Sequence, residues 1–298
     1  MIIIKIIINN EEKEVNLLND YLFTKVFGEI GCDRETLYLT NTFTGKNFKT
    51  LRYEQNEIKG KYEGNKKSIV DVLVTMNDKT IVSIESQIGK QKKFHKRTHH
   101  YSTKIHSIFL TIGEDYENLP MIIMINFLDF SFHPLEDYHL IFTQTEKTHK
   151  EYSIEDLAET HYIEIPKFRK QVKKGNIDLN DPKIRLMLLL DKETPQNLIE
   201  KVIKMDEYAN NIYEKAKLVL KNQKQYLAYI RAEQAEQDQK AMLKYAEEKG
   251  EEKGKEEGRI EGKEEEKIET AKRLKDMDFS IEDVAKATNL TIEIIKTL

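Results

Sequence analysis

The sequence is poor in three features that define common protein classes: cysteine, long apolar runs and net positive charge. Cys32 is the only cysteine, which excludes an internal disulfide and a cysteine-based zinc site and fits a reducing compartment. The apolar start of the chain, MIIIKIII, is interrupted by Lys5 and is far shorter than the ~20 residues of a membrane-spanning helix. It also lacks the longer apolar region and the cleavage site of a signal peptide. We therefore expect a cytoplasmic protein without a membrane segment, whose first residues form a β-strand.

The charge balance argues against a protein that binds nucleic acid through its overall field. The formal net charge is -4 and the pI is near 6.1, so any contact with nucleic acid must depend on local groups of basic residues. Charged residues make up 34% of the 298 residues, which is a high share for one compact domain. We therefore expect part of the chain to form an extended, solvated helix.

The most informative stretch is IVDVLVTMNDKTIVSIESQI, residues 69–88. Two apolar runs flank the turn residues Asn77-Asp78-Lys79, a pattern that predicts a β-hairpin. A three-residue loop sets the register, because it places Val72 opposite Ile84. The alternation of side chains then predicts one core face, made of Val72, Val74, Met76, Val82, Ile84 and Ile88.

The same register places Asp71 directly opposite Glu85. Carboxylates across an antiparallel pair lie about 5 Å apart at Cβ and repel one another. A divalent cation offsets that repulsion, and carboxylate oxygens suit magnesium or manganese. The alternative is a hairpin whose second face is solvated, with both acids directed toward water. The hairpin alone leaves both interpretations open.

The residues around this pair carry a family resemblance. Asp71 and Glu85-Ser86-Gln87 are similar to the core motif of the PD-(D/E)XK nucleases, with glutamine in the usual lysine position. The flanking segments resemble the Rpn family of recombination-promoting nucleases, which are also described as transposases. The resemblance covers about residues 19–167, and it rests on NDYLFTKVFG (19–28), KFHKRTHHYSTK (93–104) and GEDYENLPMIIMINFLDF (113–130).

The resemblance implies a metal-dependent DNA endonuclease. Asp71 and Glu85 are then expected to bind Mg²⁺ or Mn²⁺, and the backbone carbonyl of Ser86 is expected to add a ligand. The cation polarises the phosphate and acidifies a water molecule that attacks phosphorus. Gln87 could orient that water but brings no positive charge. We expect Lys96 or Lys104 to supply the missing charge.

Two supporting roles also follow from the resemblance. Arg97 and Tyr101 match an arginine and a tyrosine of the family, and Arg97 is expected to neutralise charge on the scissile phosphate, which suits its planar fork. Core packing is the alternative for Tyr101. Asp20, on the first helix, is expected to hold a metal-bound water, and a surface acid is its alternative. Five lysines are candidate DNA contacts: Lys25, Lys66, Lys67, Lys96 and Lys104.

Basic residues and tyrosines alternate between Lys46 and Lys67. This pattern suits a track for the DNA backbone, in which cations hold phosphates and rings carry bases. A solvated strand and loop is the alternative interpretation.

The pattern of elements predicts an α/β fold, a restriction-endonuclease-like mixed sheet flanked by helices over residues 1–174. Apolar periodicity predicts helices over 15–28 and 34–44, each ended by a glycine. The run from Met121 to Phe130 predicts a buried strand. Residues 138–144 and 161–166 predict two more strands, with a short helix over 154–159 between them.

An all-α extension is expected after the α/β domain. Residues 175–270 predict a helical region with a long charged helix, and its four glycines, Gly250, Gly254, Gly258 and Gly262, predict a frayed helix or a flexible spacer. A glycine stripe for close helix pairing is the alternative. Residues 271–298 resemble two helices of a helix-turn-helix, with Ser280 and Thr291 as N-caps and Ile294 at a packing position.

The long helix suggests a homo-oligomer. The rival function for the whole chain is therefore a degenerate nuclease fold that serves as an oligomerising or DNA-binding interaction protein.

Overall fold

The computed structural model describes residues 5–8, 11–58, 68–89, 93–109, 115–154, 157–175 and 177–298. Contacts divide the chain into two compact units, Met1–Gln237 and Asp238–Leu298, and each is described by itself. The predicted domain boundaries after residues 174 and 270 stay predictions. Within the described ranges, no helix combines the length and the apolar character needed to span a membrane.

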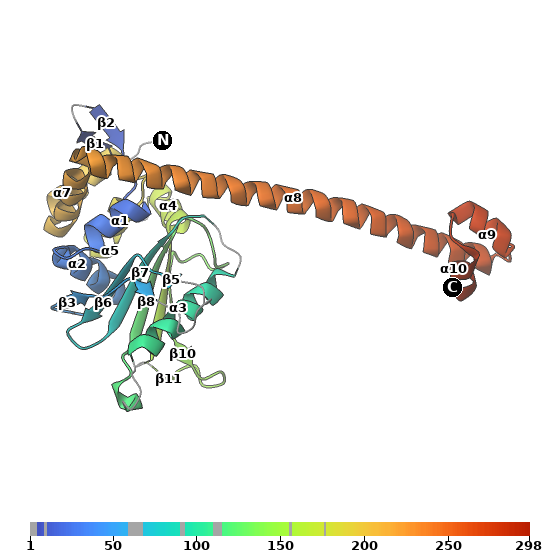
Figure 1. The fold of residues 1–298 in the computed structure, drawn as a ribbon, viewed down its shortest axis with the longest axis horizontal. Helices are drawn as coiled ribbons and strands as arrows, with labels where there is room; N and C mark the ends of the chain where they lie inside the picture. Colours follow the sequence, from blue (N-terminus) through green and yellow to red (C-terminus); the bar gives the residue numbers. More distant parts are fainter. Residues whose placement is uncertain are drawn as a thin grey trace. The chain divides into compact units, whose positions relative to one another are not determined.

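The first unit is built on a six-stranded mixed sheet (Figure 1) with the order β3-β6-β7-β8-β12-β9. β7 pairs with β8 and β8 pairs with β12 in parallel, and the other neighbours are antiparallel. The strands are β3 (Leu51–Tyr53), β6 (Val72–Met76), β7 (Ile81–Gln87), β8 (Ile122–Leu128), β9 (His139–Phe142) and β12 (Ala158–Glu164). The remaining described strands pair in twos, β1 (Lys5–Ile8) with β2 (Glu11–Glu14), β4 (Glu57–Ile58) with β5 (Ser68–Ile69) and β10 (Gln144–Thr145) with β11 (Ser153–Ile154).

The β6–β7 hairpin has the predicted register. Val72 pairs with Ile84 and Val74 with Val82. Lys79 has φ 70°, so one residue of the three-residue loop takes the left-handed conformation that closes such a hairpin. The strand before the loop and the strand after it therefore meet with Asp71 and Glu85 at the same end.

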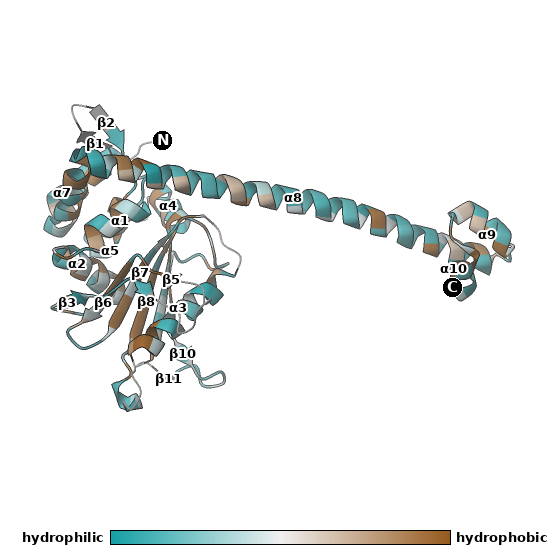
Figure 2. Ribbon diagram, in the orientation of Figure 1, coloured by the Kyte–Doolittle hydropathy of each residue, from teal (hydrophilic) through white to brown (hydrophobic). Residues whose placement is uncertain are grey.

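Both faces of the sheet are covered, and the strands with the strongest apolar character lie in its middle (Figure 2). The predicted core face of the hairpin packs against α1 (Asp20–Phe27) and α2 (Asp33–Thr44). Leu73 and Ile81, on the other face, pack against Ile105 of α3 (Phe94–Phe109), so the alternative of a solvated second face is wrong there. Burying each such side chain contributes about 1.5–3 kcal/mol. The first core is shared by α4 (Ile165–Lys173), α5 (Pro182–Leu190), α6 (Gln196–Met205) and α7 (Glu207–Lys221), and by Tyr229 at the start of α8 (Gln223–Asp276).

The local sequence pattern predicted two helix ends correctly, and it predicted a helix where the structure has strands. Gly28 and Gly45 end α1 and α2 as predicted, whereas α1 begins only at Asp20, after the Asn19 cap. The short helix predicted over 154–159 is wrong, because the described residues there belong to β11 and β12. β12 pairs with β8 on one side and β9 on the other, and those backbone hydrogen bonds override the local pattern. A 3₁₀ turn, η1 (Tyr116–Asn118), precedes β8.

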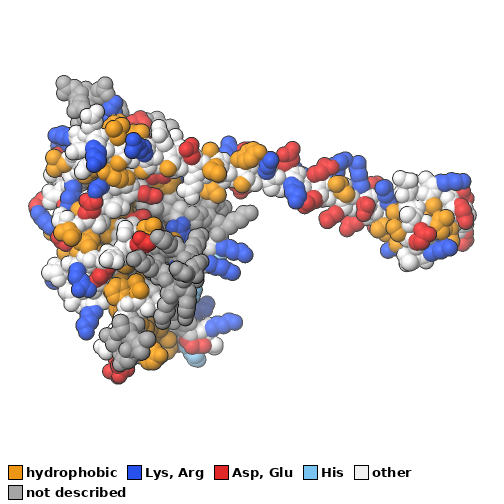
Figure 3. Space-filling model, in the orientation of Figure 1, with side chains coloured by type: hydrophobic (Ala, Val, Ile, Leu, Met, Phe, Trp, Pro, Cys, Tyr) orange, Lys and Arg blue, Asp and Glu red, His pale blue; other side chains and the backbone are white. Residues whose placement is uncertain are grey.

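The glycine-rich tract is helical, which corrects the prediction of a frayed helix or spacer. α8 (Gln223–Asp276) runs without a break through all four glycines. Lysine, glutamate and arginine are good helix formers, and ion pairs one turn apart join Glu251 to Lys255 and Lys253 to Glu257. Charges of both signs alternate along this part of α8 (Figure 3).

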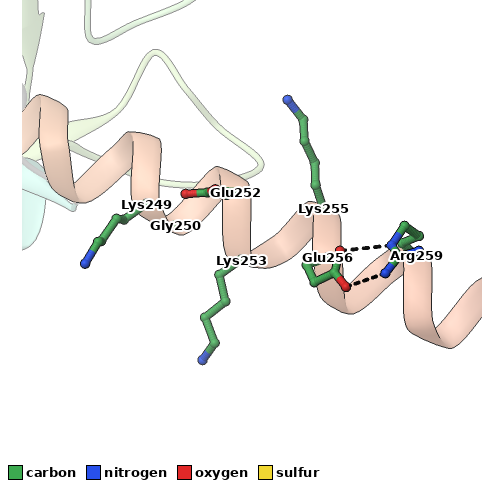
Figure 4. Close-up of a pocket in the computed structure, with 7 residues that line it drawn as sticks. All are labelled: Lys249, Gly250, Glu252, Lys253, Lys255, Glu256 and Arg259. Atoms are coloured by element: carbon green, nitrogen blue, oxygen red, sulfur yellow. Dashed lines mark hydrogen bonds and ion pairs between the residues drawn. The ribbon is translucent and has the colours of Figure 1, made fainter.

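A surface hollow follows α8 between Lys249 and Arg259 (Figure 4). Its side chains come from one helix and point apart, except for Glu256 and Arg259, which pair at 2.6 Å. Because no groups converge there, we place no site in this hollow.

The end of the chain forms a small cluster of its own with the last turns of α8. α9 (Ile281–Thr288) and α10 (Ile292–Thr297) carry the predicted caps, since Ser280 and Thr291 accept from backbone N–H groups. Ile295 is buried with Ala271 and Val284. Ile294 is exposed, so its predicted packing role is wrong, because the next residue of the same helix, Ile295, faces the cluster instead.

Candidate active site

Two carboxylates meet where β6 begins and β7 ends. Asp71 directly precedes β6, and Glu85 lies in β7 on the neighbouring strand. The Ser86 backbone N–H donates a 2.7 Å hydrogen bond to Asp71 Oδ2, which holds this carboxylate against β7. The antiparallel hairpin thus brings together two acids that are 14 positions apart, as the register requires.

Glu85 is buried without a full set of partners. Glu85 is 6% exposed, and its Oε1 has no hydrogen-bond partner among the described residues. Arg97 Nη2 lies 4.0 Å from Oε2. Burial raises the pKa of Glu85 well above its ordinary value, Asp71 raises it further, and Arg97 opposes the rise. A buried, unsatisfied carboxylate oxygen is costly, so this position is under electrostatic stress.

Asp71 and Asp20 are subject to the same effects. Burial raises the pKa of Asp71 to about 7, against the opposing hydrogen bond from Ser86, and Asp20 adds to the rise. Asp20 lies on α1 and is open to solvent, but partial desolvation still raises its pKa while Arg97 lowers it. Three acids therefore interact electrostatically around one arginine.

Arg97 is held by Gln87 and Tyr101. Its Nη1 donates to Gln87 Oε1 at 2.7 Å, and its Nε donates to the Tyr101 hydroxyl at 3.2 Å. The guanidinium also lies 5.1 Å from the centre of the Tyr101 ring. Tyr101 packs on the apolar cluster under α3 as well, so the packing role and the polar role coexist.

Gln87, which stands in the usual lysine position, is bonded to Arg97. Gln87 Nε2 donates to the Ile88 carbonyl, so both ends of the amide are engaged within the protein. Arg97, twelve residues after Glu85, places a cation beside that carboxylate. The role predicted for Lys96 or Lys104 stays a prediction. Lys96 is exposed and Lys104 is half-buried, on α3.

The loop before α1 completes the site from the other side of the hairpin. Ser86 Oγ donates to the Leu18 carbonyl at 2.6 Å, and Asn19 caps α1. Glu236 of α8 accepts hydrogen bonds from Asn19 Nδ2 at 3.1 Å and from the Asp20 N–H at 3.4 Å. Sequence reasoning missed this contact because it joins residues more than 200 positions apart with no local signal.

The lysines predicted to contact DNA lie on different elements and do not form one cluster among the described residues. Lys25 forms an ion pair with Glu29 at the end of α1 and lies over the Tyr21 ring. Lys96 and Lys104 share α3 with Arg97. Lys66 and Lys67 lie outside the described residues.

The candidate donors for a metal are the oxygen atoms of the Asp71 and Glu85 carboxylates and of the Ser86 backbone carbonyl. Within the described ranges, no group of three or more histidine, cysteine, aspartate or glutamate side chains is arranged to hold an ion. Beside Asp71, a hollow of about 450 Å³ opens toward solvent, and Glu54, Glu57 and Gly28 help to line it. Asp71 is thus a half-buried residue at the edge of this hollow.

The crossover from β7 through α3 to the parallel strand β8, with acids at the open end of the β6–β7 hairpin, defines a fold of the PD-(D/E)XK nuclease type. A family model described as PD-(D/E)XK nuclease family transposase matches residues 17–246. The chain belongs to this family, which confirms the resemblance found in the sequence. The searches of curated proteins and of solved structures gave no match.

Proposed function

We propose that the protein is a metal-dependent DNA endonuclease that hydrolyses phosphodiester bonds. The observation that carries the proposal is the buried Glu85 Oε1, an acceptor without a partner in the described chain, beside a second carboxylate of raised pKa. Structural carboxylates in protein interiors are normally satisfied, whereas sites that must receive a ligand are not. Membership of a nuclease family agrees with this reading.

The donor set fits Mg²⁺ or Mn²⁺. The Asp71 and Glu85 carboxylates and the Ser86 carbonyl are hard oxygen ligands of the kind that such ions take, with water completing the shell. A cation bound between the two carboxylates would give Glu85 Oε1 a partner and would reduce the repulsion between Asp71 and Glu85. When bound, the cation would polarise the phosphate and lower the pKa of a water molecule.

The protein's own side chains would then position the reacting groups and neutralise charge on the phosphate. Gln87 and Tyr101 fix the fork of Arg97 next to Glu85, where the guanidinium can pair with oxygens of the scissile phosphate. In this reading Arg97 supplies the charge that lysine supplies in relatives. Asp20, whose pKa is raised, would accept a hydrogen bond from a water at the rim of the site.

DNA is the proposed partner, and charge around α3 favours it. Between Glu85 and Glu114 the chain has no carboxylate at all, although acids make up 52 of its 298 residues. This segment carries Lys96, Arg97 and Lys104. Lysine and arginine that hold phosphates give the sequence-independent part of DNA binding. Lys25, Lys66 and Lys67 remain proposed contacts of the same kind.

Two further features belong to the proposal. A cytoplasmic location agrees with the single, buried cysteine. Self-association through the exposed part of α8 agrees with its length of 54 residues. That helix and the loss of the motif lysine also favour the rival function, a degenerate nuclease fold kept for interaction.

Incubation with supercoiled plasmid and Mg²⁺ separates the two functions. We expect nicking by the unmodified protein, loss of nicking in Asp71→Ala and Glu85→Ala, and no change in Asp137→Ala, which removes an exposed acid from a loop. Equal products from all four proteins would reject the catalytic assignment. Binding of plasmid without any cleavage would favour the rival.

A further inference from the structure

The first turns of α8 contact the loop that leads into the candidate active site. The Tyr229 hydroxyl accepts a 3.0 Å hydrogen bond from the Asn16 N–H, and Tyr229 is 1% exposed. Glu236, seven residues later, contacts Asn19 and Asp20. Residues seven apart lie on the same face of a helix, two turns from each other. One face of α8 therefore holds the loop at both of its ends.

That loop is bonded to the carboxylates. Leu18, between the two points of contact, accepts from Ser86 Oγ at 2.6 Å, and the Ser86 N–H donates to Asp71 at 2.7 Å. Asn19 is fully buried, and its Oδ1 accepts from the Leu22 N–H at the start of α1. A continuous set of hydrogen bonds and one short stretch of backbone thus connects Glu236 with Asp71.

A carboxylate is well suited to this place. The first N–H groups of α1 lack partners within the helix, and the helix dipole favours a negative charge beside them. Glu236 occupies this end of α1 while leaving the Asp20 side chain free to face solvent. The matched family model extends to residue 246 and so includes these turns of α8.

We propose that Glu236 is a positioning residue of the nuclease site, which acts through Asn19, Leu18 and Ser86 on the placement of Asp71 and Asp20. The first turns of α8 are then part of the catalytic assembly and not only the start of a charged arm. This inference rests on the proposed function, since it assigns Glu236 to the same site.

Three variants of the full chain test the role. Glu236→Ala removes the acceptor, and Glu236→Gln keeps an acceptor oxygen without the charge. Glu233→Ala removes a half-buried acid of the same helix face that has no hydrogen bond to the loop in the described structure. Each protein is assayed for kcat and KM in plasmid nicking, and for Mn²⁺ binding by electron paramagnetic resonance without DNA.

We expect Glu236→Ala to lower kcat roughly tenfold to a hundredfold at unchanged KM and to weaken Mn²⁺ binding roughly tenfold, as loss of groups behind metal ligands does. Glu236→Gln should recover to within about threefold, and Glu233→Ala should match the unmodified protein. A merely structural contact would lower thermal stability and leave kcat and Mn²⁺ affinity unchanged below the transition.

Equal kcat and equal Mn²⁺ affinity in Glu236→Ala would overturn the inference and leave the nuclease proposal intact. If the unmodified protein binds Mn²⁺ but does not cleave DNA, the proposed function fails, and the Mn²⁺ comparison still decides the role of Glu236. Neither cleavage nor Mn²⁺ binding by the unmodified protein would reject both.

Discussion

Two buried glutamates of the same sheet, Glu85 and Glu164, show how a site differs from a structural ion pair. Glu164, at the end of β12, is fully buried, and it accepts from the Phe132 and His133 N–H groups at 2.9 and 3.1 Å. Lys167 lies 2.8 Å from it. Glu85 is almost as buried, but Arg97 is at 4.0 Å and one oxygen has no hydrogen-bond partner among the described residues.

The difference shows that burial alone does not mark a functional acid. Taking a carboxylate out of water costs several kcal/mol, which hydrogen bonds and a counter-ion must offset. The chain supplies that compensation in full at Glu164 and only in part at Glu85, where the Asp71 backbone and Arg97 act and Oε1 has no hydrogen-bond partner among the described residues. We infer that an external cation binds at the Glu85 oxygen that lacks a hydrogen-bond partner. The variants below test the role of Glu85 in activity and that of Glu164 in stability.

The largest effect is expected from Glu85→Gln. The amide keeps the size of the side chain but removes the charge that would bind the metal. We predict a fall in nicking rate of at least about ten thousandfold, which corresponds to more than about 5 kcal/mol of barrier. The rate is measured on plasmid with Mg²⁺, and thermal melting serves as the control for folding. Retention of a tenth of the activity would remove Glu85 from the site.

Glu164→Ala should instead destabilise the fold. The change leaves Lys167 without its carboxylate and two buried N–H groups without an acceptor. We predict a loss of roughly 3–4 kcal/mol in the free energy of unfolding, measured with urea. Glu136→Ala, on the nearby surface loop, is the matched control and should change stability by less than about 0.5 kcal/mol. A loss below 1 kcal/mol in Glu164→Ala would show that the two glutamates are not different in kind.

Arg97→Lys tests whether the fork of arginine matters at Glu85. Lysine cannot bond Gln87 and Tyr101 at once, although it keeps the positive charge. We expect kcat to fall roughly tenfold to a hundredfold, or about 1.4–2.7 kcal/mol. Comparable rates in the two proteins would mean that charge alone is required. Melting temperatures of both are compared to exclude a folding defect.

A smaller effect concerns pH and the stability of the metal-free protein. The folded pKa of Asp71, about 7, lies above the ordinary 3.8, so the folded state binds more protons between these values. Stability must then fall as pH rises from about 4 to about 7 and level off above. We expect Asp71 to contribute a loss of about 2–3 kcal/mol between pH 5 and pH 8, and Asp71→Asn should remove this part. Glu85, whose pKa is also raised, adds to the loss in the same direction. Urea unfolding with a chelator at pH 5 and pH 8 measures the difference. An equal slope in the variant would assign the pH dependence to other groups.

The sequence was sufficient for the hairpin and its acids because both depend on local rules. Alternation of side chains and a three-residue loop fix the register, and the register alone brings Asp71 opposite Glu85. Family motifs pointed to Arg97 and Tyr101. The helix-ending glycines Gly28 and Gly45 were equally readable, since they follow from helix geometry.

What could not be predicted depends on distant contacts. The hydrogen bond between Arg97 and Gln87 depends on how α3 packs on the sheet. The hydrogen bond between Glu236 and Asn19 joins residues 217 positions apart in the sequence. The strand at residues 158–164 forms because β8 and β9 flank it. The helical glycine tract was misjudged because the cost of each glycine was given more weight than the helix-forming residues around it.

Metal-dependent stabilisation tests the central claim most directly. Thermal unfolding is recorded at pH 8 with and without Mg²⁺ for the unmodified protein, Glu85→Gln and Asp71→Asn. Binding to the folded state at a hundred times Kd would add about 2.7 kcal/mol of stability. We predict a clear rise in melting temperature for the unmodified protein and none for either variant. Equal rises in all three proteins would contradict the assignment of Asp71 and Glu85 as the metal ligands.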